Sequence, residues 1–201
     1  MLNKKALTLI ELIIACILMG TVILGITGLA LFFVEQVTAN MERQRLQSQI
    51  DYAFEDMQLR CLSASKSTTS PVISPGGTST HLEFIGEQDI YAINPSGVLA
   101  TTKRLYRYDV SVASDIVLRT CPGTTTPPCE GIKVTTEEIL VDHRFAPPTG
   151  TNFLQFNHTT GTEPNFLTVT IRARTERAPI GADRDIAKSD GLRFWFVDVV
   201  E

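Results

Sequence analysis

The pattern of hydrophobic and polar positions divides the chain into two regions. Residues 7–34 are apolar, with Glu11 as the only ionisable side chain among them. As a helix rising 1.5 Å per residue, this run would extend about 42 Å, more than the ~30 Å hydrocarbon core of a bilayer. The pattern therefore predicts one membrane-spanning helix near the N-terminus.

The same helix is predicted to continue as an amphipathic segment over residues 35–63. Residues 35–62 contain no Gly or Pro, and apolar residues recur at steps of three and four with one slip of five. The predicted apolar face consists of Val37, Met41, Leu46, Ile50, Ala53, Phe54, Met57 and Cys61. Glu42, Arg43 and Arg45 lie on the other side and are expected to be a solvated face.

Beyond the helix the hydrophobic period changes to two, as in half-buried strands. A Ser/Thr/Pro/Gly-rich stretch at about residues 63–81 reads as a surface loop. The predicted strands are residues 81–86 and 89–94 as a hairpin turning at 86–88, then 103–112, 116–120, 132–142, 152–158, 166–174 and 192–200. Trp195 in the last strand is expected in the core. The fold class is α+β: a long N-terminal helix packed on a C-terminal antiparallel β domain, residues 64–201.

Charge refines this picture. The 201 residues carry a formal net charge of −4, which argues against nucleic-acid binding by bulk charge. Lys4 and Lys5 precede the apolar run, so the positive-inside rule places the N-terminus in the cytoplasm and the β domain outside. The alternative is a cleaved secretory signal, whose apolar stretch is about 7–15 residues long and is followed by a small-residue cleavage site. This run is longer, and no such site follows it.

The cysteines fit an oxidising exterior. Cys121 and Cys129 bracket the loop "CPGTTTPPC" and are predicted to form a disulfide. The alternative is two unpaired thiols in a loop, and no His or second Cys pair stands at zinc-ligand spacing. Cys61 is expected to be a small buried residue on the helix.

Catalytic motifs are absent from the sequence: there is no nucleophile elbow, phosphate-binding loop, HExxH pair or Rossmann fingerprint. The chain is therefore predicted not to be an enzyme. Its three histidines stand in separate strand or turn contexts and are expected at the surface: His81, His143 and His158.

One loop offers a candidate cofactor site. The stretch "GADRDIAKSDG" contains three aspartates, and carboxylate oxygens are calcium ligands. The candidate ligands are Asp183, Asp185 and Asp190. Their spacing does not match an EF-hand, and the alternative is an ordinary turn between two strands. No other cofactor is predicted.

The stretch "KKALTLIELIIA" at residues 4–15 resembles the N-terminal signature of type IV pilins and type II secretion pseudopilins. The resemblance implies that residues 1–6 are a leader, cut by a prepilin peptidase between Ala6 and Leu7, and that Leu7 is N-methylated. Residues 8–12 match the family's "TLIEL" core. The chain departs from the family pattern in having Ala and Leu, in place of Gly and Phe or Met, around the cut. Gly28 stands where many members have a helix-breaking Pro.

The β region is similar to the J/W-type minor subunits of this family, which share a helix, two small sheets and a late "L-x-V-x-I/L" strand. The resemblance implies a structural subunit of a type IV pilus-like filament or secretion pseudopilus, held in the bacterial inner membrane before assembly, with a periplasmic or extracellular domain. The implied partners are other pilin or pseudopilin subunits, the prepilin peptidase and an inner-membrane assembly platform. Glu11 would pair with the new amine of a neighbouring subunit, and its presence argues against the tip subunit.

Two other classes of function stay open on sequence. A pilus-associated binding module, for adhesion or DNA uptake, would use exposed basic residues of the β domain. The candidates form two groups: Lys103, Arg104 and Arg107, and Arg172, Arg174 and Arg177. A membrane-anchored enzyme is the third reading, supported by no constellation of residues.

Overall fold

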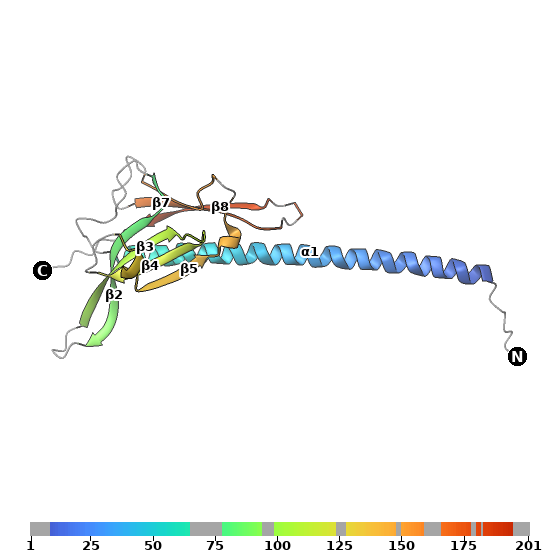
Figure 1. Ribbon diagram of the computed structural model, residues 1–201, viewed down its shortest axis with the longest axis horizontal. Helices are drawn as coiled ribbons and strands as arrows, with labels where there is room; N and C mark the ends of the chain where they lie inside the picture. The colour runs from blue at the N-terminus through green and yellow to red at the C-terminus, as the bar shows by residue number, and fades with distance from the viewer. Residues whose placement is uncertain are drawn as a thin grey trace.

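A long helix and two antiparallel sheets make up the structure, a computed structural model (Figure 1). It describes residues 9–64, 78–93, 99–123, 128–147, 150–158, 166–177, 180–181 and 183–194. The predicted leader, its cleavage site at Ala6 and Leu7, and Trp195 lie outside the described residues. The arrangement confirms the α+β class, with the helix first and the β domain after it.

Helix α1 spans Leu9–Leu62 without interruption and confirms the predicted continuity of the apolar and amphipathic segments. Its 54 residues extend about 81 Å. The helix passes through Gly20, Gly25 and Gly28 with no neighbouring atom near any of them.

The buried face of α1 corrects two predicted core positions. The buried residues are Ala39, Leu46, Ile50, Ala53, Phe54, Met57 and Cys61. Val37 and Met41 are instead 54% and 65% exposed. At 100° per residue, Val37 is about 180° and Met41 about 140° from Leu46, so both point away from the domain. The five-residue step from Met41 to Leu46 in the predicted pattern marks the point where the apolar positions change to another face of the helix.

The first sheet has the strand order β2-β3-β4-β5, with all neighbours antiparallel. Its strands are β2 (Leu82–Ile93), β3 (Leu99–Val110), β4 (Ile116–Pro122) and β5 (Thr136–Val141). The predicted hairpin turn at residues 86–88 is wrong, because β2 continues through Gly86 and pairs with β3. Glycine is required there by close packing: a Cβ would lie 2.8 Å from the Tyr106 ring and 3.3 Å from Ser63 Oγ.

The second sheet has the order β1-β6-β7-β8 and is also antiparallel. Its strands are β1 (Thr78–Ser79), β6 (Leu154–Asn157), β7 (Phe166–Arg174) and β8 (Asp185–Arg193). Strand β7 matches its prediction, whereas β8 occupies the stretch predicted as an aspartate-rich loop. Gly191 of β8 lies under the Phe166 ring, where a Cβ would be 2.6 Å from the ring. Two short 3-10 helices complete the domain: η1 (Gly131–Lys133) and η2 (His143–Phe145).

The core lies where the second half of α1 meets both sheets. The helix runs beside β5 and β8, each the last strand of its sheet. Leu46, Phe84 and Phe156 come from the helix and the two sheets and belong to one continuous buried cluster. The buried Tyr108 hydroxyl donates a 2.7 Å hydrogen bond to Asp56 Oδ2, which adds a polar anchor between helix and sheet.

Candidate functional site: the exposed apolar helix and its junction with the domain

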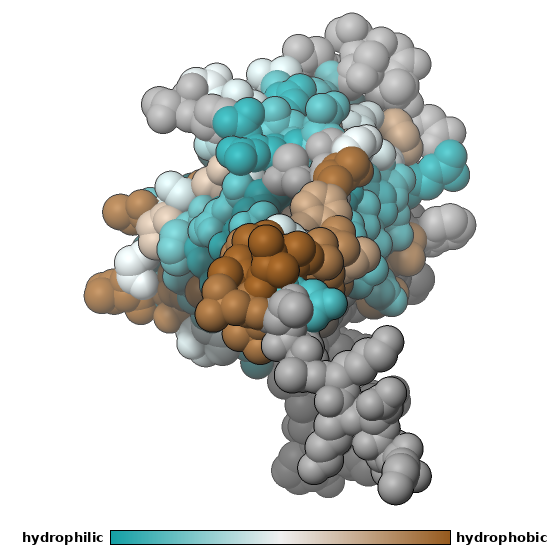
Figure 2. Space-filling view, turned by 90° about the vertical axis from the view of Figure 1, so that its right-hand side faces the viewer, coloured by the Kyte–Doolittle hydropathy of each residue, from teal (hydrophilic) through white to brown (hydrophobic). Residues whose placement is uncertain are grey.

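The first half of α1 is apolar and exposed on every side. Residues 9–35 contain no buried residue, and this part of the helix is long and apolar enough to cross a membrane. Viewed from its free end, the helix presents a hydrophobic surface in front of a mainly hydrophilic domain (Figure 2). An apolar surface of this size is not left to water by a soluble protein. The chain therefore fits a single-pass membrane protein.

The polar groups within this half of the helix suit an apolar environment. The Thr21 hydroxyl donates to the Leu18 carbonyl and the Thr27 hydroxyl to the Ile23 carbonyl, each at 2.8 Å. Such back-bonding satisfies a hydroxyl without water. Glu11 lies in the first turn, where the partial positive charge of the helix N-terminus favours an acid. Its carboxylate projects from an exposed position on the helix surface.

A series of polar contacts joins α1 to β8 and the loop before it. Each pairs a helix side chain with the strand or its loop: Gln36 Oε1 with Ile180 N at 3.0 Å, Arg43 Nη1 with Asp183 O at 2.8 Å, Asp51 Oδ1 with Lys188 Nζ at 2.6 Å, and Gln58 Nε2 with Asp190 Oδ2 at 3.1 Å. The contacts follow the same order along the helix, from residue 36 to 58, and along the partner segment, from residue 180 to 190. Helix α1 and β8 therefore run in the same direction along the junction.

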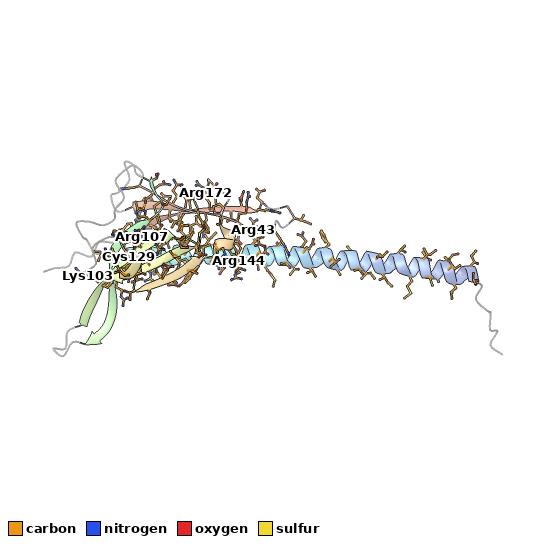
Figure 3. All side chains as sticks on the ribbon, in the orientation of Figure 1. Arg43, Lys103, Arg107, Cys129, Arg144 and Arg172 are labelled. Atoms are coloured by element: carbon orange, nitrogen blue, oxygen red, sulfur yellow. A yellow bond between two sulfur atoms is a disulfide. The ribbon has the colours of Figure 1, made fainter. Side chains whose placement is uncertain are left out.

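Arg43, expected on a solvated face, is half-buried and its guanidinium donates to the Asp183 carbonyl before β8, whereas Arg45 is exposed as expected (Figure 3). On the other flank of α1, the Tyr52 hydroxyl donates to Glu138 Oε1 of β5 at 2.9 Å. This hydrogen bond, together with the charge of Glu138, raises the pKa of Tyr52. Polar side chains on both flanks thus fix the helix between the edge strands of the two sheets.

The predicted disulfide between Cys121 and Cys129 is confirmed, with a Cα–Cα distance of 5.8 Å. Both cysteines are buried, and the Cys129 amide donates to Glu83 Oε1 at 2.6 Å. Glu130, the next residue, forms a 2.8 Å ion pair with Arg107. The disulfide therefore holds Cys129 and Glu130 against the outer face of the first sheet.

The two remaining cysteines lie on α1. Cys61 is buried as predicted, and burial raises the pKa of its thiol. Cys16 is exposed on the apolar half of the helix.

Neither predicted group of basic residues forms a free basic patch. Lys103 and Arg107 share one face of β3, and Arg104 lies on the other because strand side chains alternate. Arg107 is 7% exposed and is paired with Asp109 at 2.7 Å. In the second group, Arg174 pairs with Asp185 at 2.6 Å and Arg172 donates to Gln155 at 3.2 Å, which leaves Arg177 exposed beyond the strand.

The three aspartates of the candidate calcium site do not converge. Asp185 and Asp190 are both on β8, five residues or about 17 Å apart. Asp185 pairs with Arg174, which lowers the pKa of Asp185 by its hydrogen bond, and Asp190 accepts from Gln58. The prediction of one loop that gathers these carboxylates is therefore wrong, because pairing with β7 extends the segment.

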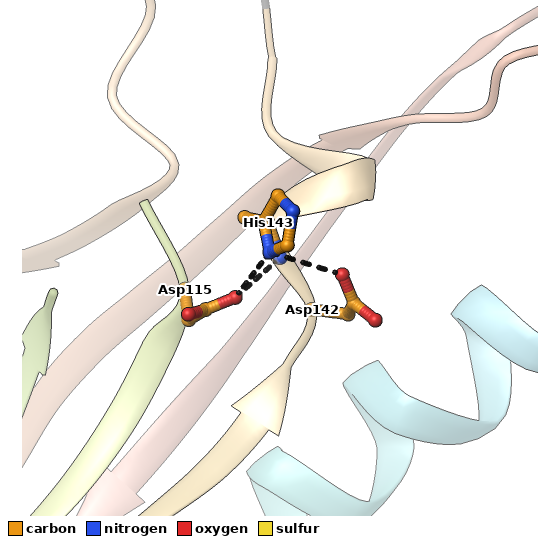
Figure 4. A group of neighbouring side chains, drawn as sticks. All are labelled: Asp115, Asp142 and His143. Carbon is orange, nitrogen blue, oxygen red and sulfur yellow. Dashed lines mark hydrogen bonds and ion pairs between the residues drawn. The ribbon is translucent and has the colours of Figure 1, made fainter. Parts of the chain in front are cut away.

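Among the described residues, one cluster has its ligand-type atoms within 4.8 Å of one another: Asp115, Asp142 and His143 (Figure 4). Asp115 Oδ1 accepts from the His143 amide at 2.6 Å and lies 3.0 Å from His143 Nδ1. Asp142 caps η2 by accepting from the Arg144 amide at 3.0 Å, and it also binds the Arg144 guanidinium. These bonds lower the pKa of Asp142 from 3.8 to about 2. Both carboxylates thus hold the turn that η2 makes after β5.

Sequence reasoning missed this cluster, because Asp115 is distant in the chain from the other two residues. It also misjudged one histidine: His158 is only 5% exposed, although a surface position was expected. His143 is exposed as expected, and His81 is half-buried beside Ser79.

A hollow of about 470 Å³ lies between the turn after β3 and the start of β6. Its polar lining includes Thr80, Ser114 and Asn152. Its charged lining residue is Asp109, whose carboxylate already accepts from Arg107 and the Val110 amide. The described residues that line the hollow offer hydrogen-bonding groups.

Comparison of the chain with protein-family models, curated proteins and solved structures gave no match in any of the three. The class of the protein is therefore described from its own structure. Over its described residues it is an α+β protein with one candidate membrane-spanning helix, which continues into a helix packed on a disulfide-bonded domain of two antiparallel sheets.

Proposed function

We propose that the chain is a minor pilin or pseudopilin, a structural subunit that leaves the inner membrane to join a type IV pilus-like filament or a secretion pseudopilus. The observation that carries the proposal is the first half of α1, which is exposed on every side and has an acid in its first turn. A filament would bury this surface against the same helix of other subunits. The β domain would face outward.

The contacts of α1 with β5 and β8 support this role because they fix the helix to the β domain. A filament subunit must transmit the position of its domain to the helix that packs in the filament core. Contacts along residues 36–58 hold helix and domain together on both flanks. The exposed half continues the same uninterrupted helix, so it extends directly from the part that is fixed to the domain.

Glu11 supplies specificity that apolar packing lacks. Helices leaving lipid for a helical bundle gain little hydrophobic free energy, because lipid tails are as apolar as leucine. Cleavage after Ala6 would create an α-amine on Leu7, and the Glu11 carboxylate of one subunit would pair with the amine of its neighbour. Such a pair fixes the axial stagger of adjacent helices, which is the best-attested use of buried polar groups.

Removing Glu11 would leave the neighbouring subunit's amine buried without its carboxylate, and this sets the expected loss of assembly free energy. Removing one member of a buried ion pair costs about 3–5 kcal/mol, because the other charge stays buried without compensation. At 1.4 kcal/mol per tenfold change, even about 3 kcal/mol lowers the equilibrium for subunit addition more than a hundredfold.

Filament incorporation of Glu11 variants tests the proposal. Glu11→Val and Glu11→Gln are compared with Thr21→Val, a change in the same apolar helix that keeps all charges. All three should be found in the membrane fraction at wild-type levels. Only the two Glu11 variants should be missing from sheared filaments, and their normal incorporation would refute the charge-pair mechanism.

A further inference from the structure

The loop between β7 and β8 reaches further along α1 towards its N-terminus than the rest of the domain (Figure 1). Its Ile180 amide donates to Gln36 Oε1 at 3.0 Å, so Ile180 lies next to the point where the apolar run ends. The Ile180 side chain is 69% exposed. An exposed isoleucine thus lies beside the end of a candidate membrane span.

The base of this loop is held in place by buried and bidentate contacts. Thr175 is 1% exposed, its hydroxyl donates to the Arg177 carbonyl at 2.8 Å, and its amide donates to the Arg184 carbonyl at 3.1 Å. At the end of the β7–β8 pair, Arg174 Nε and Nη2 donate to the two oxygens of the Asp185 carboxylate, at 2.6 and 2.9 Å. With the Gln36 contact, these bonds fix the height of Ile180 along the helix.

The position of Ile180 along the axis of α1 gives its depth in the bilayer. With Glu11 near the headgroups of one leaflet, Gln36 is 25 residues or about 37 Å further along the axis. The hydrocarbon core is ~30 Å thick, and the bilayer with its headgroups is about 40–45 Å thick. A tilt of about 20° reduces the span to about 35 Å. In either case Gln36, and Ile180 beside it, fall in the headgroup layer of the opposite leaflet.

We infer that Ile180, between β7 and β8, makes a second membrane contact by entering the phospholipid headgroup layer next to the helix that spans it. The charges nearby are mixed, with Arg177 and Arg184 exposed and Asp183 and Glu35 exposed too. The contact is therefore carried by the apolar side chain, and it does not require anionic lipid. It depends on the membrane span and not on filament assembly.

This contact would set the orientation of the domain on the membrane before assembly. A single helix allows the domain to tilt and rotate above the bilayer. A second contact at Ile180, on the β8 flank of α1, would restrain both motions and present one side of each subunit to its neighbours.

Depth-dependent fluorescence quenching tests the inference on the full chain in vesicles. A single reactive cysteine at Ile180→Cys, in a Cys16→Ala background, carries an environment-sensitive fluorophore. Ile132→Cys is the matched control. It is an exposed isoleucine too, but it lies at the other end of the domain, since β5 follows it and runs back towards Gln49.

In phosphatidylcholine vesicles containing lipid with a shallow nitroxide, the label at 180 should be quenched at least about twofold more than the label at 132. Adding anionic phosphatidylglycerol should leave that ratio unchanged. Equal quenching at both sites would overturn the inference. A label at Arg177→Cys gives a second readout: Ile180→Asp should reduce its quenching, and an unchanged signal would show that Ile180 does not make the contact.

Discussion

Truncation of Leu46 to alanine is expected to destabilise the β domain, although Leu46 lies on the helix. Leu46 is 0% exposed and packs in the cluster shared by α1 and both sheets. Its surroundings are constrained by strands on either side of the helix, so the cavity left by truncation cannot collapse freely. We expect a loss of about 2–5 kcal/mol in the free energy of unfolding.

Leu59→Ala is the matched control, with the same change of side chain on the same helix. Leu59 is 62% exposed, so the change removes little buried surface, and alanine is the better helix former. We expect a change within about 0.5 kcal/mol. Denaturant titration of the full chain in detergent micelles, followed by near-ultraviolet circular dichroism of the buried tyrosines, measures both variants. Equal destabilisation would refute the assignment of the two helix faces.

Three further changes test other parts of the structure. Cys121→Ser with Cys129→Ser should lower the free energy of unfolding by about 2.5 kcal/mol for a loop of 8 residues, measured by the same titration. Because the pKa of Asp142 is lowered, its contribution to the free energy of unfolding is complete above pH 3.8 and is lost as the pH falls towards 2. Asp142→Asn should therefore reduce the loss of stability between these two pH values. Gly86→Ala should cost about 1–3 kcal/mol, because the new Cβ meets the buried Tyr106 ring, and a neutral result would contradict that contact.

Local patterns were sufficient for the elements with strong periodicity. The helix could be predicted because its first half is apolar throughout and its second half lacks helix breakers. Strand β7 could be predicted from the alternation of Leu167, Val169 and Ile171, all buried. These elements are specified by their own residues.

The errors fall where distant parts of the chain decide the structure. Strand β8 is mostly exposed and polar, so its sequence looks like a loop; pairing with β7 makes it a strand, consistent with the dependence of strands on context. Gly86 looks like a turn residue but is required by the Tyr106 ring across the sheet. The helix contacts of Gln36 and Arg43 also join residues far apart in the chain, and no local spacing reveals them.

The same distinction applies to the candidate site. The acid in the apolar helix could be recognised from sequence because its oddity is local: one charge in a membrane-grade run. The partner that the proposal assigns to it in the filament is the N-terminal amine of a neighbouring subunit, which the sequence pattern of one chain does not position. The height of Ile180 relative to Glu11 likewise required the folded junction.

If the chain is processed and built into a filament, the intact mass of the protein recovered from sheared filaments will show both events. The recovered protein should begin at Leu7 and carry one additional methyl group on its amine. A protein that retains residues 1–6, or one that is found in the membrane but never in the filaments, would refute the proposed function.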